Sequence, residues 1–163
     1  MDSITTTDFV KYFWDKHCDL YHDNTNTCMK SLMTTLNGLL RINKHSTILE
    51  AGCGPGMTSK MIANDCKKDA TVYCIDLAPN MVKRAVKNFE EYDDFNSNTN
   101  NSFEYIKQED ILNHIDVIED NALIRTTRNG KVFKFMEGDC ENLKFKDQQF
   151  DCVISSLVLM LTS

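Results

Sequence analysis

The sequence predicts an α/β fold in which a parallel sheet is flanked by helices. Four short apolar runs, at 47–51, 70–76, 132–136 and 151–154, are rich in β-branched and aromatic residues and indicate buried strands. Helical periodicity separates the first two runs. Parallel strands need a crossover connection, which is usually a helix, so this alternation favours a parallel sheet. A length of 163 residues predicts one domain, 1–163.

Two helices are expected ahead of the first strand. Residues 8–22 form an aromatic-rich amphipathic segment that holds the only tryptophan. In residues 28–41 leucine and methionine recur at helical spacing, which indicates core packing rather than a cofactor site. Three polar side chains of the first helix are candidate bases or substrate anchors, with surface or packing roles as the alternative: His17, Tyr21 and His22.

A glycine cluster directly after the first strand is the most informative local feature. Three of the six glycines and one of the two prolines fall within residues 52–56. Glycine permits positive φ and lets the backbone approach a ligand without a Cβ in the way. The helix expected at 57–66 points its N-terminal amides toward this loop. A strand, a glycine loop and a helix in this order form the local geometry of a nucleotide cradle.

The glycine spacing distinguishes between nucleotide-binding motifs. The dinucleotide fingerprint G-x-G-x-x-G needs glycine or alanine at position 57, where this chain has Met57. The glycines instead follow a G-x-G-x-G spacing. No Gly-Lys-Ser/Thr closes the loop, which excludes a P-loop. The spacing therefore favours an adenosyl ligand, and a dehydrogenase is the less favoured alternative.

The segment Ile48–Thr58 resembles the first motif of the class I S-adenosylmethionine-dependent methyltransferases. Three further segments follow in the order of that family: a strand that ends at Asp76, a strand and loop at 132–143, and a strand with its following residues at 150–159. The resemblance covers roughly residues 46–90 and 131–161. It is closest to the small-molecule methyltransferases that include the ubiquinone and menaquinone biosynthesis enzymes. The fold that it implies is Rossmann-like.

The resemblance implies a set of contacts to S-adenosyl-L-methionine. Asp76 would accept hydrogen bonds from both ribose hydroxyls, and Asp139 with a neighbouring amide would read the adenine edge. Glu50 would order the methionine end of the cofactor through water. The implied cofactor-binding residues are Glu50, Ala51, Gly52, Cys53, Gly54, Gly56, Asp76, Leu77, Gly138, Asp139, Cys140 and Ser155.

Each of the three acids also has a structural alternative. Asp76 could be a solvated acid at a strand end, and Asp139 could belong to an ordinary turn after Gly138. Glu50 could be a carboxylate that nearby backbone amides satisfy. Ser155 and Ser156 could touch the substrate or the methionine moiety, or simply cap the end of the fourth strand.

Methyl transfer from a sulfonium is an in-line displacement with an activated leaving group. The protein mostly supplies proximity and alignment, so no catalytic residue is predicted. We expect transfer of a methyl group to a small-molecule acceptor. The alternative is a catalytically silent cofactor-binding module that acts as a regulatory partner. The resemblance also implies that the leading segment, residues 1–27, packs over the cofactor pocket as a lid. The alternative is that Phe9, Phe13 and Trp14 of this segment simply pack on the sheet.

An insertion at 91–130 separates the two parts of the predicted core, 28–90 and 131–161. Residues 91–102 are rich in Asp, Asn and Ser and are expected to form a loop, and 103–118 has moderate helical periodicity. Residues 122–135 read as an antiparallel hairpin because Asn129-Gly130 is a strong two-residue turn signal. This hairpin would add a strand beside the third strand of the sheet.

The related family winds seven strands, in the spatial order 3-2-1-4-5-7-6, whereas this sequence stops just after the fourth. We therefore expect a sheet truncated after the fourth core strand, with residues 151–154 and the apolar tail 157–161 at an open edge. Three explanations stay open: a fragment of a longer protein, pairing with a second copy, or a partner that completes the sheet.

Composition excludes several classes of protein. A net charge of −6 argues against a nucleic-acid surface, which needs a basic patch. The seven cysteines show neither metal-ligand spacing nor a disulfide framework, so no metal is expected and a reducing compartment is favoured. The sequence has no apolar stretch of the roughly 18 residues that a membrane span needs, and no signal peptide. A cytoplasmic protein is the expectation.

Overall fold

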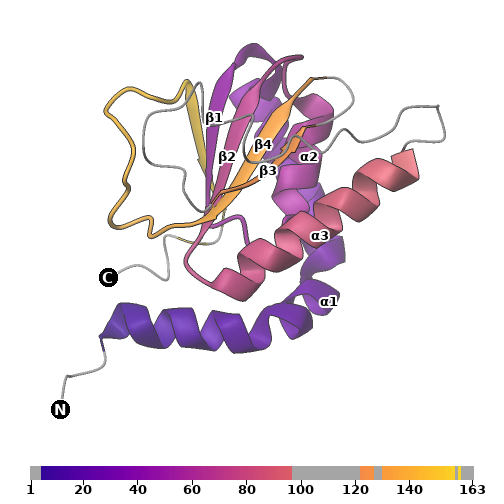
Figure 1. Cartoon of the computed structure of the whole chain (residues 1–163). Coiled ribbons are helices and arrows are strands. Elements are labelled where there is room, and N and C mark those ends of the chain that lie inside the picture. Colours follow the sequence, from indigo (N-terminus) through magenta and orange to yellow (C-terminus); the bar gives the residue numbers. More distant parts are fainter. Residues whose placement is uncertain (1–4, 97–121, 127–129, 157, 159–163) are drawn as a thin grey trace.

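The computed structural model describes residues 5–96, 122–126, 130–156 and 158 (Figure 1). The helix expected at 103–118 and the loop expected at 97–102 lie outside these residues. The elements in chain order are α1 (Thr6–Leu40), the 3-10 helix η1 (Ile42–Lys44), β1 (Thr47–Ala51), α2 (Met57–Asp65), β2 (Thr71–Asp76), α3 (Pro79–Asn96), β3 (Leu123–Thr126), β4 (Val132–Glu137) and β5 (Cys152–Ser155).

The described strands form one sheet in the order β3-β4-β2-β1-β5. Strands β4, β2, β1 and β5 are parallel, and β3 pairs antiparallel with β4. The predicted α/β class and the order 3-2-1-4 of the core strands are confirmed. The three central strands start in step, because Thr71 pairs with both Thr47 and Val132. Their carboxyl ends therefore meet at one edge, where the predicted cofactor-binding residues lie.

The hairpin of β3 and β4 is present, but its register corrects the predicted turn. A two-residue turn at Asn129-Gly130 would pair Thr126 with Phe133. The structure pairs Thr126 with Val132 instead, so the connection has an odd number of residues. Gly130 does adopt positive φ, at 81°, which fits longer hairpin loops that place a glycine in the left-handed region.

Two helix boundaries differ from the prediction. The helices expected at 8–22 and 28–41 are one continuous helix, α1. The residues between them are Asn and Thr rich but include no proline or glycine, so helix interruption was not obligatory. Helix α1 begins at a capping box formed by Thr5 and Asp8. Helix α3 runs on to Asn96, so the first part of the loop expected from residue 91 is helical.

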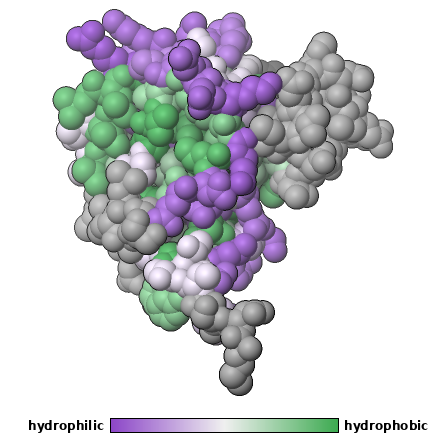
Figure 2. Space-filling model, turned by 90° about the vertical axis from the view of Figure 1, so that its left-hand side faces the viewer, coloured by the Kyte–Doolittle hydropathy of each residue, from purple (hydrophilic) through white to green (hydrophobic). Residues whose placement is uncertain are grey.

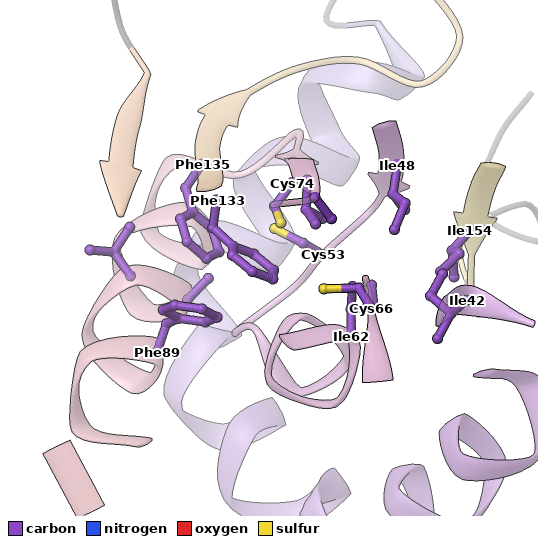
Figure 3. Packing of buried hydrophobic residues seen from close by; sticks show 14 of the residues in the cluster. Ile42, Ile48, Cys53, Ile62, Cys66, Cys74, Phe89, Phe133, Phe135 and Ile154 are labelled. Atoms are coloured by element: carbon purple, nitrogen blue, oxygen red, sulfur yellow. The ribbon is translucent and has the colours of Figure 1, made fainter. Parts of the chain in front are cut away.

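One face of the sheet is sealed by helices. Side chains from β1, β2, β4 and β5 pack there against α2, α3 and η1, with Phe89 of α3 against Phe133 and Phe135 of β4 (Figure 3). The two β4 rings and Ile48 are fully shielded from solvent. Helix α1 contacts both α2 and α3. This helix-covered face holds the larger cluster of buried residues.

The opposite face carries a smaller cluster of Leu49, Ala51, Ile75 and Met136. The segment 138–151 covers part of it, with Phe145 and Phe150 stacked edge-on against Tyr73 of β2. Val153 of the edge strand β5 stays 55% exposed. Hydrophobic residues gather on this side of the molecule in Figure 2. We call it the loop-covered face.

None of the described helices combines the length and the apolar composition that crossing a membrane requires.

Candidate functional site

The glycine loop after β1 is anchored to the end of β2. Gly52 and Cys53 both donate their backbone N–H to the carbonyl of Ile75, at 2.8 and 2.9 Å. The backbone N–H of Gly54 donates to Oδ2 of Asp76 at 2.8 Å. All three glycines of the loop have positive φ, between 52° and 84°, which explains their residue type. The loop is thus held in one shape by its neighbouring strand.

The three glycines face different surroundings. A Cβ on Gly56 would lie 2.9 Å from Cα of Ala85, so this glycine permits close packing of the loop on α3. A Cβ on Gly52 would clash with Cγ2 of Val158, so this end of the loop is covered by the chain that follows β5. A Cβ on Gly54 would approach only the ring of Tyr21, at 3.9 Å. The open part of the cradle is therefore at Gly54.

Asp76 ends β2 beside this open position. Its Oδ1 accepts the backbone N–H of Ala78 at 2.9 Å, and its Oδ2 accepts that of Gly54. Burial raises the pKa of Asp76, while these two backbone hydrogen bonds lower it. Each carboxylate oxygen can accept a further hydrogen bond, so the loop-anchoring role leaves acceptor capacity for a ligand hydroxyl.

Two buried polar atoms flank the glycine loop without a hydrogen-bond partner in the described part of the chain. They are Oε1 of Glu50, on β1, and Oγ of Ser155, at the end of β5. The other Glu50 oxygen, Oε2, accepts a hydrogen bond from the Ser59 hydroxyl of α2 at 2.6 Å. Buried polar atoms without partners are uncommon in native proteins, and a bound water, a bound ion or a functional role can account for them.

The residues expected to read the adenine edge lie after β4. Gly138 donates its N–H to the carbonyl of Asp76 at 2.9 Å, which holds the ends of β4 and β2 together. Oδ1 of Asp139 accepts the N–H of Glu141 at 2.9 Å, and the Asp139 carbonyl accepts the N–H of Asn142. The Asp139 side chain thus has a turn-forming role, which was the alternative considered above. Cys140 is half-buried beside it.

All twelve predicted cofactor-binding residues are among the described ones. They lie on the carboxyl ends of β1, β2, β4 and β5 and in the segments that follow these ends. Leu77 is half-buried directly after Asp76, and Ala51 and Cys53 are buried beside Gly52. The sequence motifs therefore converge at one edge of the sheet, as ligand sites of open α/β sheets do.

Helix α1 lies across this edge of the sheet. Lys11 forms an ion pair of 3.2 Å with Glu137 at the end of β4. Asp15 accepts hydrogen bonds from the N–H and the side-chain amide of Asn80, at the start of α3. Tyr21 reaches Gly54. These contacts set α1 over the ends of β4 and β2 and over the open part of the loop.

The candidate bases of α1 have other contacts. Nδ1 of His17 lies 2.7 Å from the carbonyl of Phe13, one helical turn earlier. Nδ1 of His22 lies 3.2 Å from the amide nitrogen of Asn88, a buried residue of α3 that also donates to the carbonyl of Pro55 at 2.8 Å. Sequence reasoning missed Asn88 and Ser59, because their partners are distant in the chain and neither lies in a motif.

Two family models match the sequence, and both are described as a methyltransferase domain. The first matches residues 48–116 and the second residues 114–163. Together the two matches run from residue 48 to residue 163, so the sequence carries methyltransferase-domain signatures. The order of its motifs and of its core strands resembles that of the class I S-adenosylmethionine-dependent methyltransferases. No curated protein was found to match the sequence.

Two solved structures align with this chain, and the first of them shares its fold. A protein from Methanococcus maripaludis, described as an S-adenosylmethionine-dependent methyltransferase, aligns with a TM-score of 0.56 at 15% identity, over 100% of this chain and 55% of its own. The magnesium protoporphyrin IX methyltransferase of Synechocystis PCC 6803, solved with bound S-adenosylhomocysteine, aligns at 22% identity over 88% of this chain and 46% of its own, with a TM-score of 0.40. This chain thus spans about half the length of these structural neighbours. No comparison favours the silent regulatory module.

Proposed function

We propose that this chain binds S-adenosyl-L-methionine at the glycine loop and supports transfer of its methyl group to a small-molecule acceptor. The observation that carries the proposal is the cradle at Gly54, which is open on the ligand side and is flanked by the carboxylate of Asp76. The unpartnered Oε1 of Glu50 and Oγ of Ser155 give the same edge two further polar groups. A glycine loop followed by a helix N-terminus and an acid suits a nucleoside ligand.

In this proposal the chain binds and orients its ligands. Asp76 holds the ribose, the turn at Asp139 faces the adenine, and Tyr21 of α1 shields the open part of the loop. When bound, the cofactor supplies an activated methyl group on a sulfonium. Enzymes of this reaction type gain much of their rate from alignment of acceptor and methyl group, which fits a site without a recognisable catalytic dyad.

Binding calorimetry tests the proposal directly. We expect the full chain to bind S-adenosylhomocysteine and not NAD, because the loop spacing departs from the dinucleotide fingerprint. Tight binding of NAD without binding of the thioether ligand would overturn the assignment.

Asp76→Ala separates ligand recognition from loop anchoring. Loss of a charge-assisted hydrogen bond is expected to weaken binding of S-adenosylhomocysteine by ~1.5–3 kcal/mol. The same substitution should weaken binding of a 2′-deoxyribose analogue by less, because one hydroxyl donor is already missing. Equal losses for both ligands would show that Asp76 acts only by holding Gly54, and an unchanged affinity would remove it from the site.

A further inference from the structure

Glu50 is a buried acid immediately beneath the proposed cofactor loop, two residues before Gly52. The residue is only 2% exposed. Its Oε2 accepts the short hydrogen bond from Ser59, and its Oε1 has no partner among the described residues. Such a half-satisfied carboxyl is costly to keep inside a protein. A ligand bound in the loop could offset this cost by interacting with the Glu50 carboxyl.

The groups around Glu50 offer no positive charge. Its sheet partners are Cys74 on β2 and Ile154 on β5, and Ser59 faces it from α2. The titratable neighbours are Asp76, which is acidic, and the buried thiols of Cys74 and Cys53. Within the described part of the chain, no cationic side chain affects this carboxyl.

Burial without a counter-charge keeps the acid protonated to an unusually high pH. Desolvation raises the pKa of Glu50 from 4.5 to about 7, against the lowering effect of Ser59 and of the Cys74 thiol. The ionised form would thus gain from any positive charge in the loop, since charges interact strongly in a low-dielectric interior. S-adenosylmethionine carries such a charge on its sulfonium, and the thioether product S-adenosylhomocysteine does not.

We infer that Glu50 senses the charge of the cofactor: its carboxyl releases a proton to solvent when the sulfonium compound binds and retains the proton when the thioether product binds. This inference rests on the proposed function. It makes Glu50 a specificity-determining residue that favours cofactor over product. The preference for the cofactor over the product increases as the pH rises. Above neutral pH the Glu50 carboxyl of the free protein is already ionised, so no proton has to leave when the cofactor binds.

Calorimetry in two buffers of different ionisation enthalpy measures the proton count. For the full chain at pH 6, we expect the cofactor to release close to one proton more than the product does, and this difference to vanish by pH 8. Because the free carboxyl titrates near pH 7, the ratio of the two affinities should rise roughly tenfold between pH 6 and pH 8 in favour of the cofactor. This measurement on the unmodified chain needs no variant.

Two variants sharpen the test. Glu50→Gln keeps the size of the side chain and removes its titration, so the extra proton release and the rise of the ratio should both disappear. Glu91→Gln makes the same chemical change at an exposed position of α3, where the carboxylate lies 4.0 Å from Lys87, and should keep the profile of the unmodified chain.

The outcomes are distinguishable. Binding of both ligands with equal proton release and a constant affinity ratio would overturn the inference and leave the proposed function standing. A profile that Glu50→Gln leaves unchanged would assign the proton to another group and overturn it as well. Binding of neither ligand would overturn both.

Discussion

The two faces of the sheet bury their apolar side chains in different ways. On the helix-covered face, α2, α3 and η1 seal a continuous cluster in which the rings of Phe133 and Phe135 are fully shielded. On the loop-covered face, a single irregular segment presents Phe145 and Phe150 to Tyr73 and leaves Val153 exposed. The difference predicts that the helix-covered face contributes more to the stability of the described fold than the loop-covered face does.

Two of the buried ionisable side chains, Lys134 on the loop-covered face and Glu50 on the helix-covered face, have different surroundings. On the loop-covered face, Nζ of Lys134 lies 3.2 Å from Oη of Tyr73 and 4.7 Å from the centre of its ring. On the helix-covered face, Glu50 has one satisfied and one unsatisfied oxygen. The lysine thus has partners that suit a cation. The acid, in contrast, has one oxygen without a hydrogen-bond partner in the described part of the chain, and a ligand can supply that partner.

Truncating one aromatic ring on each face gives the largest expected contrast. Phe133→Ala should lower the free energy of unfolding by about 3–5 kcal/mol, because a fully buried ring leaves a cavity among Phe89 and Phe135. Phe150→Ala should cost about 1–2 kcal/mol, since that ring is only half-buried. Urea denaturation of both variants with a shared slope measures the difference. Equal losses would show that the loop segment is as important to the core as the helices.

The glycine loop lies at the carboxyl ends of the strands, and substitutions at two of its glycines should reduce stability to different extents. Gly56→Ala forces a methyl group to within 2.9 Å of the α3 backbone at positive φ, and should destabilise the fold by about 2–4 kcal/mol. Gly54→Ala meets only the Tyr21 ring at 3.9 Å, and should cost about 1–2 kcal/mol of backbone strain.

Ligand binding distinguishes the same pair. Gly54→Ala should lose affinity for S-adenosylhomocysteine despite its retained fold, because its methyl group occupies the cradle. Denaturation and calorimetry on the two variants provide both readouts. A Gly54→Ala chain that binds as tightly as the unmodified one would move the ligand away from this loop.

The acid on the helix-covered face should make stability depend on pH. The pKa of Glu50 is about 7 in the fold, against an ordinary value of 4.5, so the folded chain binds more protons than the unfolded chain between these values. Stability is therefore highest at low pH and falls as the pH rises toward 7. Relative to Glu50→Gln, the unmodified chain should lose about 2–3 kcal/mol of unfolding free energy between pH 5 and pH 8.

Denaturation of both proteins at the two pH values measures this difference. Burial also raises the pKa of Asp76, which gives a change of the same sign, but this contribution is common to the two proteins and cancels. Parallel pH curves for the unmodified chain and Glu50→Gln would mean that Glu50 is ionised in the fold throughout this range.

The resemblance to the methyltransferase family implied the order of the four core strands and the edge at which the candidate site residues lie. The sequence by itself determined the α/β class and the four core strands. These features depend on local signals: short β-branched runs, a glycine loop whose φ values only glycine adopts readily, and acids at strand ends. The cradle was predictable for the same reason.

Only the tertiary structure decided how that edge is completed. It placed α1 across the strand ends through Lys11 and Asp15, set Val158 on Gly52, and put Ser59 against Glu50. It also fixed the register of β3 on β4, which a turn signal alone does not determine. These contacts join residues far apart in the chain, and they depend on packing geometry, which leaves no periodic or local pattern in a sequence.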